Sequence, residues 1–222
     1  MSKKTAVIVG ATGSIGRELV PLAASSPRYE KLVILHRCPT QFAGLPKVEE
    51  RIIDFAKLES VASTGAVAVF CCIGTTQKKA GSTEAFQEVD RGIPVALARW
   101  AGANGAATFV TVSSLGADPR SKSVYLRTKG EMEEGVARAA VRSTYILRPS
   151  LLDGQREEFR LAEQVGTRAL AVIKPLMVGP LRRYRSISTR TVAGAMLACG
   201  EKDDPGLHIV ESETIQDLGS WA

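Results

Sequence analysis

Two side chains in this sequence have the spacing needed to move a proton. Tyr125 and Lys129 stand four residues apart, which puts a phenol and an ammonium on one face of a helix. A phenol, with a pKa of about 10, is a poor base at neutral pH, but a neighbouring cation favours its ionised form. Ser114 precedes Tyr125 by eleven residues and follows an apolar run. We predict Ser114, Tyr125 and Lys129 as catalytic residues, with Ser114 bonding the substrate oxygen.

A glycine-rich turn follows the first apolar run of the chain. Gly10 permits a tight turn, Gly13 lets backbone approach a pyrophosphate, and Gly16 lets a helix pack closely. A helix starting there presents free N–H groups and the positive end of its dipole to phosphates. A strand pattern before the turn and another about 20 residues later favour a nucleotide site over a purely structural turn. The predicted contacts are Gly10, Thr12, Gly13, Ser14, Ile15 and Gly16.

The second apolar run ends without the carboxylate that would bind the ribose hydroxyls of NAD. Arg37 stands there instead, and its guanidinium can bind a 2′-phosphate, so the sequence predicts NADP rather than NAD as the cofactor. The alternative is an exposed arginine at a strand end. Asp54, after the third run, either reaches the adenine amino group or caps a helix that begins near Ala56.

Short apolar runs separated by helical patterns predict the order of the elements. The runs are rich in Val, Ile, Phe or Thr and too short for core helices, so each is predicted as a strand. They are 5–10, 31–36, 51–53, 66–72, 108–112 and 144–147. Because they are almost continuously apolar, we expect helices on both faces. Strand and helix in strict succession predict an α/β fold with a doubly wound parallel sheet.

One predicted helix contains a proline. Apolar residues between 86 and 100 recur at intervals of three and four, which puts them on one helix face. Pro94 lies inside this pattern, so the helix is predicted to kink there.

The last third of the chain has a weaker rhythm. We expect one domain over residues 1–222, in which 150–222 partly forms a small substrate lobe. Within that lobe, 191–199 has the pattern of an amphipathic helix and 208–210 that of a strand. Residues 211–222 suggest no chemistry.

The composition is that of a globular protein. The 222 residues are 45% hydrophobic and 23% charged, with a mean hydropathy of +0.02, which excludes disordered, collagen-like and coiled-coil chains. The first apolar run is too short for a secretory or membrane segment. Four cysteines without a CxxC spacing and two histidines offer little to a metal site or a disulfide framework. We therefore expect no metal, no membrane partner, reduced thiols and a cytoplasmic location.

A basic stretch carries part of the net charge of +6. Four arginines occur in nine residues without a carboxylate: Arg182, Arg183, Arg185 and Arg190. A solvated face, a site for an anionic substrate group and a nucleic-acid surface are the three interpretations. One short cluster with a single aromatic residue argues against nucleic acid.

The glycine turn and the Ser114, Tyr125 and Lys129 set together resemble the short-chain dehydrogenase/reductase superfamily, in its extended or atypical branch. Further segments are similar to the TIP30-like (Tat-interacting protein) oxidoreductase family of bacteria. These are Phe70–Thr76, Val89–Arg91, Ser113–Asp118 and Leu147–Pro149, and the likeness spans roughly residues 5 to 200.

The resemblance implies a Rossmann-like NAD(P)-binding domain and adds residues to its cofactor site. It implies that Tyr125 donates or accepts the proton, that Lys129 also holds the nicotinamide ribose, and that Ser114 positions the substrate. The residues that it adds beside the cofactor are Cys72, Gly74, Thr75, Lys129 and Pro149.

The sequence therefore predicts an NADP-dependent oxidoreductase that transfers a hydride between the nicotinamide and a small-molecule carbonyl or alcohol substrate. An enzyme like the nucleotide-sugar epimerases and dehydratases would use the same three residues, although the short segment after Pro149 leaves little room for a nucleotide sugar. An NADP-binding regulator or sensor without turnover is the third hypothesis. The substrate, the direction of reaction and a homo-oligomeric state stay open.

Overall fold

The computed structural model describes residues 4–153 and 183–220, and these build a sheet of seven parallel strands. The order across the sheet is β3-β2-β1-β4-β5-β6-β7, and each neighbouring pair is parallel. The strands are β1 Thr5–Val9, β2 Lys31–His36, β3 Val48–Ile52, β4 Ala66–Cys71, β5 Thr108–Val112, β6 Ser143–Arg148 and β7 Gly206–Glu211.

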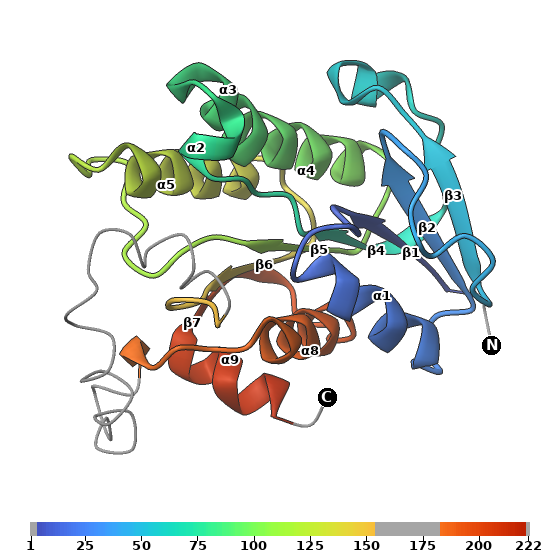
Figure 1. Cartoon of the computed structure of the whole chain (residues 1–222). Helices are drawn as coiled ribbons and strands as arrows, with labels where there is room; N and C mark the ends of the chain where they lie inside the picture. The colour runs from blue at the N-terminus through green and yellow to red at the C-terminus, as the bar shows by residue number, and fades with distance from the viewer. Residues whose placement is uncertain (1–3, 154–182, 221–222) are drawn as a thin grey trace.

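Helices cover both faces of this sheet (Figure 1). One layer consists of α1 Gly16–Ser25, α8 Thr189–Gly200 and α9 Ser212–Gly219. The opposite layer consists of α2 Gln77–Ala80, α3 Thr83–Gln87, α4 Ile93–Ala103 and α5 Val124–Ala137. Side chains of β1 alternate between the two cores, because Ala6 and Ile8 pack on the α1 side whereas Val7 and Val9 pack on the α4 side. The doubly wound α/β architecture predicted from the apolar runs is confirmed.

One predicted strand begins three residues too late. β3 starts at Val48 rather than at Arg51, and its early residues include Glu49 and Glu50. Among the described residues, β3 pairs with β2 alone and so lies at an edge of the sheet, where charged side chains are tolerated. Glu49 forms an ion pair with Lys31 of β2 at 2.5 Å, so charge replaces the apolar pattern on which the prediction depended.

A π-helical turn precedes Pro94 in the predicted helix. α3 passes through the turn Glu88–Gly92 into α4. The N–H of Ile93 donates to the carbonyl of Glu88, five residues back, and the following Pro94 has no N–H to donate. The helix therefore accommodates the proline by holding one extra residue in a single turn.

The tail of the chain extends the sheet. β7 pairs with β6 along its whole length, and α8 and α9 pack on each other beneath it (Figure 1). The helix and strand predicted at 191–199 and 208–210 fall inside α8 and β7. The small substrate lobe stays a prediction, because residues 154–182 lie outside the described ranges. Within those ranges, no helix has the length and apolarity needed to cross a membrane.

Candidate functional site

The candidate site lies where the chain reverses the order in which it builds the sheet. From β1 the chain moves outward to β2 and β3, then returns to place β4 on the other side of β1. Loops that leave β1 and β4 diverge at such a switch point and open a crevice beyond the carboxyl ends of the strands. The glycine loop 10–16 follows β1 and the segment 72–75 follows β4. Both predicted cofactor segments therefore meet here.

Close backbone packing explains two of the three glycines. Gly10 has a φ of +86°, and a Cβ on it would lie 2.7 Å from the carbonyl carbon of Cys72. A Cβ on Gly16 would lie 2.1 Å from the carbonyl oxygen of Gly10. Gly13 is less crowded, at 3.3 Å from the same oxygen, and residues 12–14 are exposed. Gly10 and Gly16 shape the turn, whereas Gly13 lies on its accessible outer surface.

The helix that follows the loop is capped by backbone, because the N–H of Arg17 donates to the carbonyl of Gly13 at 3.0 Å and that of Leu19 to the carbonyl of Ile15 at 2.9 Å. Ile15 is its N-cap residue, and no side chain in the described ranges caps the helix there. Ile15 is buried, whereas Thr12 and Ser14 are exposed. The positive end of the dipole of α1 therefore faces the exposed residues of the loop, and such an end favours a phosphate.

A pocket of about 200 Å³ opens beside the glycine loop. Its walls come from the loop, from the segment after β2, and from Phe55 and Ile73. Arg37 lines this pocket and is exposed. A pocket of mixed polar and apolar lining that includes a guanidinium fits the adenosine end of a dinucleotide. A larger hollow lies at the opposite edge of the sheet, between the amino ends of β1, β2 and β3, away from every predicted site residue.

Two carboxylates near this pocket already have partners. Glu50 of β3 lies 3.8 Å from His36 Nε2 and accepts hydrogen bonds from the N–H and hydroxyl of Thr40. The sequence did not reveal this carboxylate at the end of β2, because it arrives from the neighbouring strand. Asp54 caps the 3₁₀ helix Phe55–Ser60 by accepting a backbone N–H at 3.0 Å. Asp54 thus takes the capping role that we gave as the alternative to an adenine contact.

The segment after β4 connects the glycine loop with the lysine. The backbone of Cys72 contacts the loop, as described above. A Cβ on Gly74 would lie 3.5 Å from Asp90 Oδ1 and 3.9 Å from Lys129 Nζ. The N–H of Thr75 donates to Asp90 Oδ2 at 2.7 Å. Four residues therefore span the distance from the phosphate loop to Lys129.

Lys129 is buried and paired. Its side chain is 5% exposed, and its Nζ lies 2.8 Å from Oδ1 of Asp90, which is 1% exposed. Burial acts to lower the pKa of Lys129, but the carboxylate of Asp90 and then Tyr125 outweigh it, so this pKa lies above its ordinary value. Tyr125, one turn earlier on α5, is 39% exposed and packs against Phe86 with ring centroids 6.1 Å apart. The spacing of four thus brings together a buried ammonium and an accessible phenol.

Asp90 is a site residue to which the sequence assigned no role. It lies in the π-helical turn, four residues after Phe86 and seven before Leu97, both of which are fully buried. A carboxylate on an apolar helical stripe was the available signal. The partner, Lys129, is 39 residues away in the sequence, and no local pattern pairs the two.

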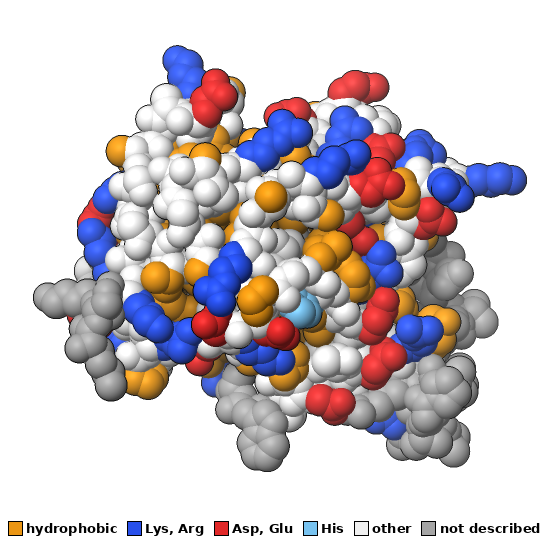
Figure 2. Space-filling view, turned by 180° about the vertical axis from the view of Figure 1, so that it is seen from behind, with side chains coloured by type: hydrophobic (Ala, Val, Ile, Leu, Met, Phe, Trp, Pro, Cys, Tyr) orange, Lys and Arg blue, Asp and Glu red, His pale blue; other side chains and the backbone are white. Residues whose placement is uncertain are grey.

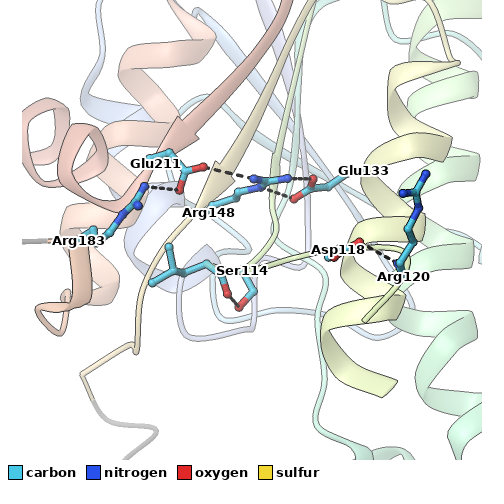
Figure 3. Close-up of polar contacts among 8 residues, drawn as sticks. Ser114, Asp118, Arg120, Glu133, Arg148, Arg183 and Glu211 are labelled. Atoms are coloured by element: carbon cyan, nitrogen blue, oxygen red, sulfur yellow. Dashed lines mark hydrogen bonds and ion pairs between the residues drawn. The ribbon is translucent and has the colours of Figure 1, made fainter. Parts of the chain in front are cut away.

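Ser114 lies in the loop between β5 and α5 (Figure 3). Its hydroxyl donates to the carbonyl of Leu115 at 3.4 Å rather than to Tyr125. The N–H of Leu115 donates to the carbonyl of Pro149 at 2.9 Å. The loop also packs so closely on α5 that a Cβ on Gly130 would lie 2.2 Å from the nitrogen of Pro119. Ser114 is thus held between Pro149 and the helix that carries the tyrosine and lysine.

A cluster of charged residues braces the strand end that leads to Pro149 (Figure 3). Arg148 donates to both carboxylate oxygens of Glu133 at 2.9 and 2.6 Å, and to Glu211 at 3.3 Å. The hydrogen bond to Glu133 raises the pKa of Arg148 above its ordinary value. We expected nothing from the tail that begins at Glu211, yet this residue ties β7 to β6 and, through Arg148, to α5.

The basic stretch is largely paired with acids where the structure describes it. Arg183 lies 3.9 and 3.8 Å from carboxylates of Glu211 and Glu213, and Arg190 lies 3.8 Å from one of Glu18. Arg182 lies outside the described residues. Figure 2 shows basic and acidic side chains interspersed on the face that it draws. The pairs favour a solvated face, and the exclusion of nucleic acid stays a prediction.

Burial disfavours the thiolate at three of the four cysteines. All four are free, and burial raises the pKa of Cys71 and Cys72 and that of Cys199 to about 11. Cys72 Sγ packs 3.8 Å from the sulfur of Met196. Over residues 4–153 and 183–220, no group of three or more His, Cys, Asp or Glu could hold a metal ion.

A family model described as NAD(P)H-binding matches residues 10–202, from the first glycine of the loop onward. The chain belongs to the NAD(P)H-binding family. The match is one continuous region that includes the glycine loop, the 72–75 segment and the helix of Tyr125 and Lys129.

Relatives within this family support the resemblance drawn from the motifs. Protein FMP52, mitochondrial, of Candida albicans is 38% identical over 158 residues, which are 68% of each chain. Protein HTATIP2 of Rattus norvegicus is 34% identical over 167 residues, which are 73% of this chain and 69% of the relative. HTATIP2 is the TIP30 protein, so the predicted resemblance is confirmed.

Solved structures share this Rossmann-like α/β fold at low sequence identity. The UDP-Glc/GlcNAc 4-epimerase of Campylobacter jejuni has a TM-score of 0.70 at 13% identity, covering 96% of this chain and 82% of its own. ElxO with NADP bound has a TM-score of 0.67 at 13% identity, covering 96% and 99%. MoeE5 in complex with UDP-glucose and NAD also has 0.67, at 17% identity, covering 98% and 81%.

The predicted cytoplasmic location is wrong by comparison with the relatives. Those from Candida albicans, Debaryomyces hansenii and Candida glabrata are all named mitochondrial. Free cysteines exclude only the oxidising compartments in which disulfides persist, so they never distinguished one reducing compartment from another.

Proposed function

We propose that this NAD(P)H-binding protein is an NADP-dependent oxidoreductase that acts on a carbonyl or secondary alcohol. One observation carries the proposal. The buried Lys129–Asp90 pair lies one helical turn from the accessible Tyr125, and the segment 72–75 joins it to the glycine loop. One short segment therefore links the phosphate loop to the ammonium and the phenol, which supports one continuous cofactor site. When bound there, NADP supplies the hydride acceptor and NADPH the hydride donor.

The cofactor would be held by groups along that crevice. The positive end of the dipole of α1 and the open surface at Gly13 suit the pyrophosphate. Arg37, which lines the pocket proposed for adenosine, suits a 2′-phosphate and supports NADP over NAD. Gly74 and Thr75 would line the path to the nicotinamide, and Lys129 would donate hydrogen bonds to its ribose.

Proton transfer would fall to the phenol. Tyr125 gives its proton to the substrate oxygen in reduction and takes it back in oxidation. The ammonium of Lys129, held charged by Asp90, stabilises the phenolate left behind. Ser114, in the loop braced by Pro149, would donate a hydrogen bond to the same substrate oxygen.

The test follows NADPH oxidation at 340 nm against a panel of aldehydes, ketones and quinones. Tyr125→Phe removes one hydroxyl, so turnover should fall by about 10² to 10⁴, the range of general acid–base catalysis, while NADPH affinity stays within twofold. Tyr184→Phe, which removes a hydroxyl from a tyrosine that is 55% exposed, should change neither. Turnover unaffected by Tyr125→Phe would refute the role of the phenol. Tight NADPH binding with every compound inert would favour the regulator without turnover.

A further inference from the structure

We propose that Asp90 is a positioning residue that keeps Lys129 charged and fixed for the nicotinamide ribose, and that the same carboxylate anchors the cofactor-lining segment at Thr75. The inference rests on the proposed function, since it takes Lys129 to contact the cofactor.

Both oxygens of Asp90 are used, and each by a different part of the site. Oδ1 accepts from Nζ of Lys129 at 2.8 Å and Oδ2 from the N–H of Thr75 at 2.7 Å. The carboxylate is 1% exposed and the lysine side chain 5%, so water cannot take over either contact without a rearrangement. A charge-assisted bond on each oxygen fixes the carboxylate and, through it, both partners.

The charge of Lys129 depends on this carboxylate. Burial favours the neutral amine, and the groups that oppose burial are Asp90 from the π-helical turn, Tyr125 from α5 and Cys71 from β4. The pKa of the Cys71 thiol is raised by burial, so Cys71 is neutral near pH 7. Among the described groups acting on Lys129, Asp90 is the one carboxylate. Without it, desolvation would lower the pKa of Lys129 toward the working range.

The π-helical turn supplies a matched control from the residue next to Asp90. Arg91 forms an ion pair with Glu131 of α5, the helix that also carries Lys129. This second pair joins the same two elements, but its side chains are 42% and 31% exposed. Removing it perturbs the same interface without touching the buried ammonium.

The experiment measures the NADPH dissociation constant from pH 7 to 9.5 for wild type, Asp90→Asn and Glu131→Gln. Asparagine keeps an acceptor for the Thr75 N–H but removes the charge. In Asp90→Asn, Lys129 should lose its proton within this range, and its hydrogen bonds to the ribose should lose their charge assistance. We expect its NADPH affinity to fall about tenfold more than that of wild type across the range. Glu131→Gln should follow wild type.

A second pair of variants keeps the test decisive if Asp90→Asn does not fold. The single variant Lys129→Met is compared with the double variant Asp90→Asn/Lys129→Met. The double variant removes both members of the ion pair, so it leaves no buried charge unpaired. If Asp90 acts through Lys129, both bind NADPH equally within twofold at every pH. A double variant that binds at least tenfold more weakly than Lys129→Met would overturn the inference.

The remaining outcomes separate the two proposals. If wild type binds NADPH and a folded Asp90→Asn variant follows it from pH 7 to 9.5, the inference alone is wrong. If wild type binds no nicotinamide nucleotide, the proposed function and the inference fall together.

Discussion

The two sides of the crevice are built by different physical means. Beside β1 and β2, close packing of the backbone sets the shape, because a Cβ on Gly10 or Gly16 would collide with neighbouring backbone atoms. Beside β4 and α5, buried charge sets it, because Asp90 holds both Lys129 and Thr75. The contact of Gly16 with Gly10 joins near neighbours in sequence, whereas the Asp90–Lys129 ion pair, like the contact of Gly10 with Cys72, exists only after the sheet has formed. The side beside β1 and β2 should therefore tolerate substitutions that change charge. The side beside β4 and α5 should tolerate substitutions that change side-chain shape but keep the charges.

The largest loss of stability is expected on the side built by charge. Lys129→Met leaves Asp90 buried without its cation, which should lower the free energy of unfolding by about 3–5 kcal/mol at pH 7. Adding Asp90→Asn should recover most of this loss, because the pair is then removed rather than broken. Urea unfolding followed by circular dichroism measures both. A loss below about 1 kcal/mol for the single variant would mean that the pair is solvated.

The same pair has a signature in alkaline solution. The pKa of Lys129 is raised above its ordinary value of 10.5, so its contribution to stability is fully present below that value and is lost as pH rises through the higher, folded value. The difference in unfolding free energy between wild type and Lys129→Met should therefore be constant from pH 7 to 9 and shrink above about 10.5. A difference that grows with pH would contradict the raised pKa.

The next effect tests the side built by backbone. A Cβ on Gly16 would meet a carbonyl oxygen at 2.1 Å, whereas one on Gly13 would meet the same oxygen at 3.3 Å. Gly16→Ala should cost about 1–3 kcal/mol of stability, and Gly13→Ala less than about 1 kcal/mol. Thermal unfolding of the two variants gives the comparison. Equal losses would show that the loop relaxes around either methyl group.

A larger side chain at the same position separates binding from folding. Gly13→Val puts methyl groups on the outer surface of the loop, where the pyrophosphate is proposed to lie, so NADPH binding should be lost while cooperative unfolding persists. Normal NADPH affinity in this variant would place the phosphates elsewhere.

Arg37→Ala should have a moderate effect, confined to the choice of cofactor. A guanidinium on a 2′-phosphate contributes about 1.5–3 kcal/mol, so wild type should prefer NADPH over NADH by tenfold or more, and the variant should lose that preference. Fluorescence titration with both nucleotides measures it. Similar affinities in wild type would point to the ribose, not the phosphate, as the group recognised beside Arg37.

The smallest effect is expected for the exposed ion pair. Glu131→Gln removes the partner of Arg91 where both side chains are about a third exposed or more, so stability should change by about 0.2–1 kcal/mol. Urea unfolding in low and high salt measures this change, which should shrink with salt. A loss equal to that of Lys129→Met would remove the contrast between the buried and the exposed pair.

The order of residues was enough to predict those parts of the fold that depend on local patterns. The apolar strands predicted the sheet, and the glycines predicted the turn after β1. The start of β3 was missed because Glu49 and Glu50 are charged residues on an edge strand. No spacing rule pairs Asp90 with Lys129 or Arg148 with Glu211, since each pair comes from separate elements. Tertiary contacts of this kind are absent from the one-dimensional pattern.

The extra residue in the π-helical turn determines in which direction the side chains before the turn point relative to those after it. Each residue turns an α-helix by about 100°, so deleting one residue between Glu88 and Gly92 would rotate everything before the turn relative to everything after it. α4 could then keep Leu97 and Trp100 in the core only if Asp90 swung away from Lys129. In evolutionary terms, this segment should accept substitutions more readily than insertions or deletions. After a change of length by one residue, the helix could keep either its core packing or the Asp90–Lys129 ion pair, but not both.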